Sequence, residues 1–230
     1  MILPLDRRPV IVALAGSNGA GKTTFYHAHL QPSGLRLINA DILARELGAE
    51  AYAAAKMAGV LRRCLVEQRE SFVFETVFSD PVGDKLAFLK EAMRTGYQVA
   101  LCFIGIASPK TSDQRVAMRV SQGGHDVPLE KLVARFPRTL ANLKAAIPVL
   151  PQVIIFDNDD LNYPFKRVAV FENGKATFLA KPPPLWFARL LQHRRKRVRL
   201  PTEQIYAELD RLCEGAPAQD TQAALRDLRQ

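Results

Sequence analysis

A glycine-rich loop with a lysine and a threonine follows the first apolar run of the chain. The run Val10–Ala15 (VIVALA) leads into GSNGAGKTTF, where Gly16 and Gly21 stand five residues apart and Lys22 and Thr23 come next. This spacing satisfies G-x-x-x-x-G-K-[ST] between a predicted strand and a predicted helix. Glycines let backbone N–H groups point at phosphate oxygens, and the following helix adds its positive dipole end. The loop predicts a triphosphate site formed by Gly16, Ser17, Asn18, Gly19, Ala20, Gly21, Lys22, Thr23 and Thr24.

Two residues of this loop have separate expected roles. Lys22 is expected to reach the β- and γ-phosphates, and the Thr23 hydroxyl is expected to ligate Mg²⁺. The predicted cofactors are therefore ATP or GTP with Mg²⁺. The alternative is a glycine-rich turn with an exposed lysine, and the flanking strand and helix disfavour it.

Two carboxylates close apolar runs that follow the loop. Asp41 ends RLINAD and Glu75 ends SFVFE. Parallel α/β sheets bind ligands at the carboxyl ends of their strands, so both acids are candidates to face the γ-phosphate. Asp41 has an alternative role as the N-cap of ILARELG, and Glu75 as a solvated strand end or a carboxylate that supports bound Mg²⁺. The residues alone leave the roles of the two acids exchangeable.

Arginines are concentrated in the segment 109–150. Arg115 and Arg119 would share one helix face, and Arg135 and Arg138 would share another beyond the turn GGHDVP. Phosphoryl transfer requires cations that neutralise charge on the transferring group, and arginines folded over the loop would supply them. The alternative is a solvated helix face of a basic protein, which for Arg115 and Arg138 is an equally good interpretation.

The elements that must position these residues are predicted to alternate between strands and helices. Apolar runs without polar alternation are separated by helix-period segments, with a longer helical insert before the last run. This alternation predicts an α/β fold with a doubly wound parallel sheet of about five strands. The expected strands are Val10–Ala15, Leu35–Asn39, Ser71–Glu75, Gln98–Ile106 and Val153–Phe156.

Three further segments complete the expected organisation. Residues 109–150 predict two helices joined by a turn, an insert placed where a lid would lie. Residues 166–179 contain a Glu-Asn-Gly-Lys turn between short alternating runs, which predicts a hairpin at the sheet edge. Beyond Pro182–Pro184, helices are expected at Leu185–Arg197 and Thr202–Leu212. We predict a main domain over residues 1–180 and a C-terminal helical extension over 181–230.

Composition limits the classes of protein to consider. The chain has 230 residues, with 32 Lys and Arg against 23 Asp and Glu, a net charge of +9 that suits phosphorylated substrates, nucleic acid or solubility. The three cysteines, Cys64, Cys102 and Cys213, lack the spacing of a disulfide framework or a zinc site. No run approaches the roughly 18 apolar residues of a membrane span. A cytoplasmic protein without a membrane partner is expected.

Taken together and in this order, GSNGAGKTTF, INADILARELG, FVFETVFS, RVSQGGHDVP and RFPRTLANL resemble the zeta toxin family of P-loop kinases, especially its compact chromosomal branch. The resemblance extends over about residues 10–158. It implies a kinase that moves the γ-phosphate of ATP or GTP to a hydroxyl of a nucleotide-activated amino sugar, typically UDP-N-acetylglucosamine. Family members often act as toxins that a partner antitoxin neutralises, so an antitoxin protein is an expected partner.

The resemblance also implies a role for each matching residue. Lys22 and Thr23 bind the triphosphate and Mg²⁺, and Asp41 is the base that takes the proton of the sugar hydroxyl. Arg119 and Arg135 clamp the γ-phosphate. The acceptor site that the resemblance implies comprises Asn39, Asp41, Arg45, Glu75 and Thr76.

Two alternatives remain beside this interpretation. The loop and the base do not choose the acceptor, so a kinase for a nucleoside, an antibiotic or a polynucleotide 5′-end is the first. The second is a nucleotide-gated module that binds nucleic acid or protein, supported only by the basic run HRRKRVR at His193–Arg199. A basic helix end with solvated side chains explains that run as well, so nucleic acid is not an expected partner.

Overall fold

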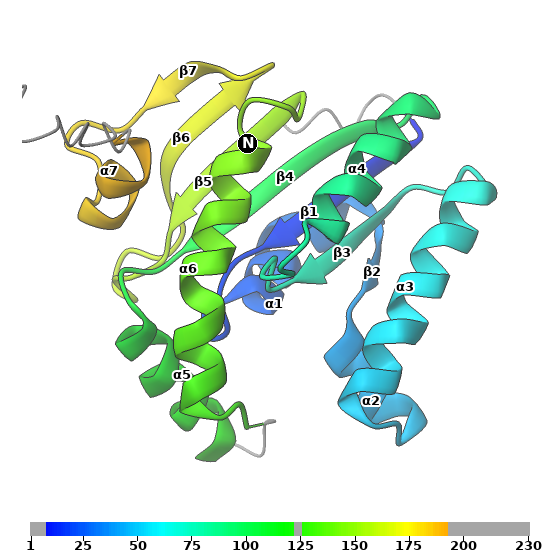
Figure 1. Ribbon diagram of the computed structural model, residues 1–230, viewed down its shortest axis with the longest axis horizontal. Coiled ribbons are helices and arrows are strands. Elements are labelled where there is room, and N and C mark those ends of the chain that lie inside the picture. Colours follow the sequence, from blue (N-terminus) through cyan, green and yellow to red (C-terminus); the bar gives the residue numbers. More distant parts are fainter. Residues whose placement is uncertain (1–7, 122–125, 193–230) are drawn as a thin grey trace, which may run out of the picture. The chain divides into compact units, whose positions relative to one another are not determined.

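The computed structural model describes residues 8–121 and 126–192. These residues form a seven-stranded sheet with the order β2-β3-β1-β4-β5-β6-β7 (Figure 1). The first five strands in this order are mutually parallel, and the last two add to the edge as an antiparallel hairpin. The strands are β1 (Val10–Ala15), β2 (Arg36–Ile38), β3 (Phe72–Thr76), β4 (Gln98–Gly105), β5 (Gln152–Asp157), β6 (Lys166–Glu172) and β7 (Lys175–Leu179).

The central strand β1 shows why the sheet is covered on both sides. All six of its residues are buried, and successive side chains point to opposite faces. Ile11, Ala13 and Ala15 belong to one apolar cluster, whereas Val10, Val12 and Leu14 belong to the other. A strand that is apolar on both faces requires helices on both faces. The predicted α/β class with a doubly wound parallel sheet is therefore confirmed.

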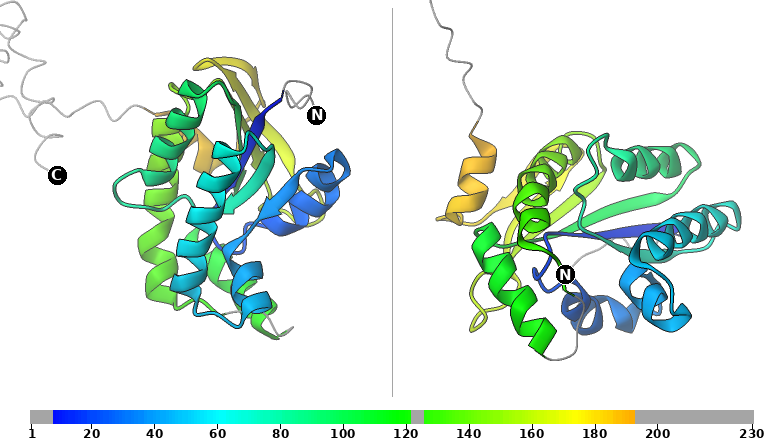
Figure 2. Two further views of the ribbon diagram at one scale, coloured as in Figure 1. Left: turned by 90° about the vertical axis from the view of Figure 1, so that its right-hand side faces the viewer. Right: turned by 60° about the horizontal axis from the view of Figure 1, so that its bottom comes forward.

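The helices divide between the two faces of the sheet. The first cluster is completed by α3 (Ala51–Glu67), α4 (Asp84–Arg94), α6 (Leu129–Ala146) and α7 (Leu185–Leu191). The second is completed by α1 (Lys22–Phe25) and the π-helical turn Tyr26–Leu30, and Figure 2 shows α1 on the opposite side of the sheet from α4. The remaining helices, α2 (Ala40–Leu47) and α5 (Pro109–Ser121), lie toward the carboxyl ends of the parallel strands, below the sheet in Figure 1.

The compact unit that contains the sheet ends at Leu191. The helix α7 belongs to this unit, because Trp186 and Phe187 are buried in the cluster on the α6 face. The Trp186 indole donates a 2.8 Å hydrogen bond to the Asp157 carboxylate at the end of β5. The predicted helix Thr202–Leu212, the basic run His193–Arg199 and the residues Gly123, Gly124 and His125 lie outside the described residues.

No helix in the described ranges is both long enough and apolar enough to cross a membrane.

Candidate functional site

The loop between β1 and α1 is shaped by its glycines. Gly16 has φ +149°, and a Cβ there would lie 2.3 Å from the Ile104 carbonyl oxygen. Gly19 has φ +70°, and a Cβ there would lie 2.9 Å from the Cβ of Arg115 on α5. The Ser112 hydroxyl of α5 donates a 2.7 Å hydrogen bond to the Asn18 carbonyl. The loop is therefore held between strand β4 and helix α5, with room at these positions for glycine alone.

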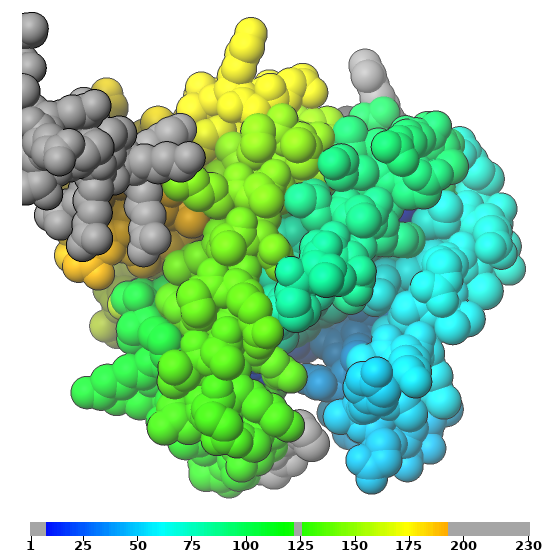
Figure 3. All heavy atoms as spheres, in the orientation of Figure 1, coloured from blue at the N-terminus to red at the C-terminus, as the bar shows by residue number. Residues whose placement is uncertain are grey.

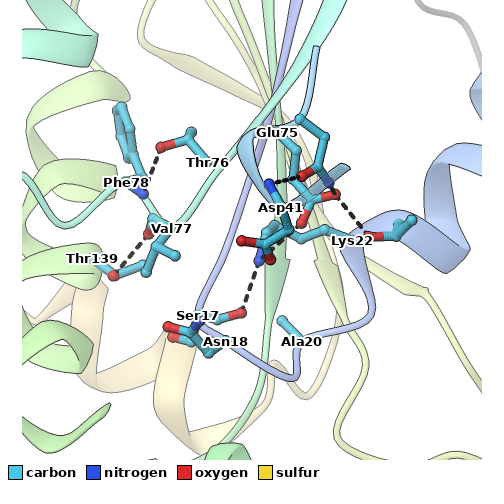
Figure 4. A network of polar contacts seen from close by, with 12 residues as sticks. Ser17, Asn18, Ala20, Lys22, Asp41, Glu75, Thr76, Val77, Phe78 and Thr139 are labelled. Carbon is cyan, nitrogen blue, oxygen red and sulfur yellow. Dashed lines mark hydrogen bonds and ion pairs between the residues drawn. The ribbon is translucent and has the colours of Figure 1, made fainter. Parts of the chain in front are cut away.

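A polar network joins the loop to the end of β3. The Glu75 carboxylate accepts a 2.8 Å hydrogen bond from the Thr23 hydroxyl, and its other oxygen lies 3.6 Å from Lys22 Nζ. Lys22 also donates to the Ser17 carbonyl at 3.1 Å. Lys22 is 6% exposed and Glu75 13% exposed, so the ion pair is only weakly screened by solvent. Figure 4 shows Lys22 and Glu75 directed toward each other, with Asp41 beside them.

The N-cap of α2 is Asn39, and this changes the interpretation of Asp41. Asn39 Oδ1 accepts hydrogen bonds from the backbone N–H groups of Asp41 and Ile42, and its Nδ2 donates to Glu75 at 2.8 Å. The alternative role of Asp41 as the cap is thus wrong. Asn39, expected in the acceptor site, is buried and has its amide engaged in positioning both Glu75 and the start of α2. The Asp41 carboxylate is exposed and makes no hydrogen bond to the described residues.

A cleft of about 460 Å³ brings most of the candidate residues together. Figure 3 shows the hollow between the atoms of α5 and α6 on one side and those of α2 and α3 on the other. Its charged lining comprises five cationic residues and two carboxylates, so the cleft is suited to an anionic ligand. These residues are Lys22, Asp41, Arg62, Glu75, Lys85, Arg115 and Arg119.

The arginines of the insert are divided between the cleft and other surfaces. Arg115 and Arg119 of α5 line the cleft beside the loop. Arg115 is oriented by a 2.9 Å hydrogen bond to the Asp159 carbonyl, and its Nη1 is buried with no hydrogen-bond partner among the described residues. Arg135 and Arg138 of α6 are described but are not among the residues that line this cleft. Of the two arginines assigned to the γ-phosphate, the structure places Arg119 in the cleft, whereas Arg135 is not among its lining residues.

Thr76 is the last residue of β3, and α6 holds the segment that follows it in place. Its hydroxyl accepts a 3.0 Å hydrogen bond from the Phe78 N–H, which is local turn chemistry, and the residue also lines the cleft. The Thr139 hydroxyl of α6 donates to the Val77 carbonyl, and Asn142 of α6 donates to the Phe78 carbonyl. The insert helix therefore fixes the segment that follows Glu75.

Arg45 faces a second hollow. This cleft of about 880 Å³ lies between the π-helical turn after α1 and helix α2, and it meets the first at Thr23, Asn39, Asp41 and Arg119. Arg45 and His27 are among its lining residues. Asp41 therefore stands where the two clefts join, accessible from both.

Asn158 was not singled out from the sequence, although it supports the loop. It follows β5, and its Nδ2 donates a 2.8 Å hydrogen bond to the Ala20 carbonyl while its Oδ1 accepts from the Phe165 N–H. The sequence signal is the one that selected Asp41 and Glu75, a polar residue at the carboxyl end of an apolar strand. The same rule applied to the fifth strand finds it.

Arg62 is a second residue that sequence reasoning missed. It lies on the buried stripe of α3 with Ala54, Ala58 and Leu65, where an apolar residue is expected. Its guanidinium stacks over the Phe74 ring at 5.0 Å, and burial lowers its pKa to about 10, with a smaller contribution from the neighbouring charge of Arg63. A basic residue in an apolar stripe is the signal that would have found it.

The residues at the loop can hold a nucleotide-bound Mg²⁺. This ion binds through few carboxylates, phosphate oxygens and waters, and the Thr23 hydroxyl hydrogen-bonded to Glu75 is a donor set of this kind. In the described part of the chain, no three or more His, Cys, Asp or Glu side chains gather as a metal site of their own.

The sequence matches the model of the AAA domain family AAA_33 over residues 11–138, which is more than half of the chain. The chain belongs to this family. No curated protein is significantly similar to it in sequence.

Similar solved structures were also found. The AvrRxo1-ORF1:ORF2 complex with ATP is 21% identical, with a TM-score of 0.58, and the match covers 74% of this chain and 60% of that chain. The same complex with sulphate ions gives 20% identity and the same TM-score and coverage. A structure of the PezAT chromosomal toxin-antitoxin system of Streptococcus pneumoniae is 16% identical, with a TM-score of 0.46, covering 90% of this chain and 87% of that chain. This chain thus spans about 60% of the AvrRxo1 chains, with which it shares the fold.

Proposed function

We propose that this protein is an ATP-dependent kinase that transfers the γ-phosphate to a hydroxyl of a nucleotide-activated amino sugar such as UDP-N-acetylglucosamine. One observation carries the proposal: an exposed carboxylate, Asp41, lines the same cleft as the phosphate-binding Lys22 and the cation Arg119. In a nucleotide hydrolase such a base would act on water. A kinase needs one within reach of the acceptor hydroxyl.

In the proposed reaction, the acceptor hydroxyl attacks the γ-phosphorus of ATP. A new oxygen–phosphorus bond forms, the bond between the γ-phosphorus and the bridging oxygen of the β-phosphate breaks, and ADP leaves. Asp41 takes the proton of the hydroxyl. Lys22 and Arg119 neutralise the charge that spreads over the transferring group, and the loop N–H groups hold the phosphates still.

Thr23 would hold the Mg²⁺ of the nucleotide, with Glu75 fixing the direction of the Thr23 hydroxyl. The bound ion supplies positive charge to the triphosphate oxygens. ATP as the nucleotide is supported by the similar structure that was solved with ATP. The acceptor class rests on the resemblance of the motifs to the zeta toxin family, whose substrates imply a cytoplasmic location.

The test is incubation of the full-length protein with ATP, Mg²⁺ and a panel of UDP-sugars, nucleosides and 5′-hydroxyl oligonucleotides. We expect ADP release to depend on an amino-sugar nucleotide. Mass spectrometry should then show a product that is heavier than this acceptor by one phosphoryl group. A phosphorylated nucleoside or oligonucleotide would support kinase activity but contradict the proposed acceptor class. ATP hydrolysis that no acceptor changes would contradict the proposal.

A protein partner is part of the same proposal. The AvrRxo1-ORF1 structures are complexes with AvrRxo1-ORF2, and the zeta toxin resemblance implies an antitoxin. Co-purification of the product of a neighbouring reading frame, together with loss of kinase activity on its addition, would support an antitoxin. Full activity in a stable complex would argue against inhibition.

A further inference from the structure

Within the described ranges, the guanidinium of Arg62 is a buried cation without an anionic partner. Arg62 is 9% exposed and lines the cleft, and its Nε finds no hydrogen-bond partner in the part of the chain that the structure describes. No ion pair joins it to the residues that the structure describes. Its neighbours are the rings of Phe74 and Phe88, whose centroids lie 5.0 and 5.7 Å from Cζ. The two rings orient the guanidinium plane, and aromatic faces offer Nε no conventional hydrogen-bond acceptor.

The charges of the cleft fall into two groups. Lys22, Arg115 and Arg119 adjoin the loop, where a triphosphate would bind. Arg62 comes from α3, and Lys85 comes from α4 one turn before Phe88, the ring beside the Arg62 guanidinium. These two cations line the cleft but belong to neither the loop nor α5. Neither carboxylate of the same lining forms an ion pair with Arg62 or Lys85, since Glu75 pairs with Lys22 and no ion pair to Asp41 is found among the described residues.

We propose that Arg62, assisted by Lys85, forms a second anion site in this cleft, which binds a phosphate group that the acceptor already carries. The assignment of this phosphate to the acceptor rests on the proposed kinase function, whereas the anion site itself does not. The planar fork of arginine matches two phosphate oxygens, and a site of low exposure strengthens the interaction. Such a contact would hold the acceptor while its hydroxyl faces Asp41.

A structural role for Arg62 predicts different behaviour. A buried charge without a partner costs stability, and an apolar side chain of similar length would fill the space between Phe74 and Phe88 at no such cost. If Arg62 serves ligand binding, Arg62→Met is as stable as the wild type or more stable without ligand, and its phosphate affinity falls. If Arg62 serves the fold, Arg62→Met is less stable and phosphate affinity is unchanged.

The experiment measures thermal stabilisation of the full-length protein by inorganic phosphate. Phosphate is titrated against chloride at constant ionic strength, so that screening does not change. A saturating non-hydrolysable ATP analogue with Mg²⁺ occupies the loop. The matched control is Arg63→Met, because Arg63 is the next residue of α3 and is exposed. Phosphate that binds elsewhere stabilises both variants equally, so the readout is the difference between them and requires no kinase activity.

The expected result is a rise in Tm with phosphate in the wild type and in Arg63→Met. Arg62→Met should need about tenfold to a hundredfold more phosphate for the same rise, as removal of a charged hydrogen-bond partner predicts. Equal phosphate dependence in the Met variants, or no stabilisation of the wild type, overturns the anion site. If Arg62→Met does not fold, Arg62→Lys is compared with Arg63→Lys, and equal dependence in that pair also overturns it. If Arg62→Met needs more phosphate than Arg63→Met but the protein transfers no phosphoryl group, the anion site is supported and only the assignment of its phosphate to an acceptor is wrong.

Discussion

The Thr23 hydroxyl and the Glu75 carboxylate are joined by a 2.8 Å hydrogen bond between residues 52 positions apart in the chain. The same carboxylate pairs with Lys22 and accepts from Asn39. Glu75 therefore contacts the loop that would hold the nucleotide as well as the helix that carries Asp41. This geometry favours a role on the nucleotide side of the cleft over a direct role in holding the acceptor.

Glu75→Gln should weaken nucleotide use more than acceptor use. The substitution removes the negative charge beside the buried Lys22 and one acceptor from Thr23, so KM for ATP should rise by roughly tenfold or more, with a lower kcat. KM for the acceptor should change little. Steady-state kinetics with each substrate varied in turn distinguish a role of Glu75 in nucleotide binding from a role in acceptor binding. A rise confined to the acceptor KM would indicate that Glu75 binds the acceptor.

Asp41→Asn should remove transfer without damage to the fold or to ATP binding. Its carboxylate makes no hydrogen bond to the described residues and does not cap α2, so the loss of stability should not exceed the roughly 0.3–1 kcal/mol that an acid in a first turn contributes. Loss of a general base is expected to lower kcat by about 10²–10⁴-fold. Single-turnover kinetics and ATP titration measure the two quantities, and near-normal kcat would exclude Asp41 as the base.

Asn39→Ala is the structural counterpart of that variant. It removes the N-cap of α2, and a loss of about 1 kcal/mol in the free energy of unfolding is expected. Urea denaturation of both variants should therefore show a larger loss of stability in Asn39→Ala than in Asp41→Asn, which keeps the cap and loses only a first-turn charge. The opposite order would mean that Asp41 contributes to the helix end.

Gly19→Ala should disrupt the loop, whereas Gly34→Ala should not. The two glycines have nearly equal φ of +70° and +72°, so the backbone strain of a side chain is matched at about 1–2 kcal/mol. A Cβ at position 34 meets nothing within 4 Å, but at position 19 it meets Arg115 and the Ser112 carbonyl. ATP affinity should fall in Gly19→Ala alone. Equal affinities would show that α5 can move away without cost.

Asp157→Asn should flatten the dependence of stability on pH in mild acid. Burial raises the pKa of Asp157 above its ordinary value of 3.8, an effect that the Trp186 hydrogen bond partly offsets. An acid with a raised pKa in the folded state binds its proton more tightly there, so stability is lost as pH rises from about 3.8 through the raised value. Asparagine keeps an oxygen acceptor for Trp186 and has no charge. Urea unfolding should show that the free energy of unfolding decreases less in the variant than in the wild type as pH rises from acid to neutral. The same dependence on pH in both proteins would contradict the raised pKa of Asp157.

The sheet was predictable because its strands carry local signals. The five runs predicted from apolar and β-branched residues all correspond to parallel strands, with ends within about two residues of those observed. The loop Gly16–Thr24 was predictable for the same reason, since its glycines, lysine and threonine are consecutive. A short motif between a strand and a helix needs no distant contact to be recognised.

The contacts of the site depended on residues far apart in the chain. The sequence was compatible with Asp41 as either an N-cap or a base. The structure excludes the N-cap role, because Asn39 caps α2. It also offered two pairs of arginines on the insert, of which the pair on α5 lines the cleft, because Ser112 and Gly19 bring that helix against the loop. The orientation of α6 relative to the sheet could not be derived from local pattern.

By itself, the sequence determined a phosphate-binding loop, the parallel sheet that carries it and two acids at strand ends. Only the tertiary structure decided that Glu75 contacts Thr23 and Lys22, that Asp41 remains exposed, and that Arg62 is buried beside the same cleft. The physical reason is that strand formation and loop shape depend on neighbours in the chain. The partner and the burial of a charged side chain depend on which helices cover it, and those helices come from distant parts of the sequence.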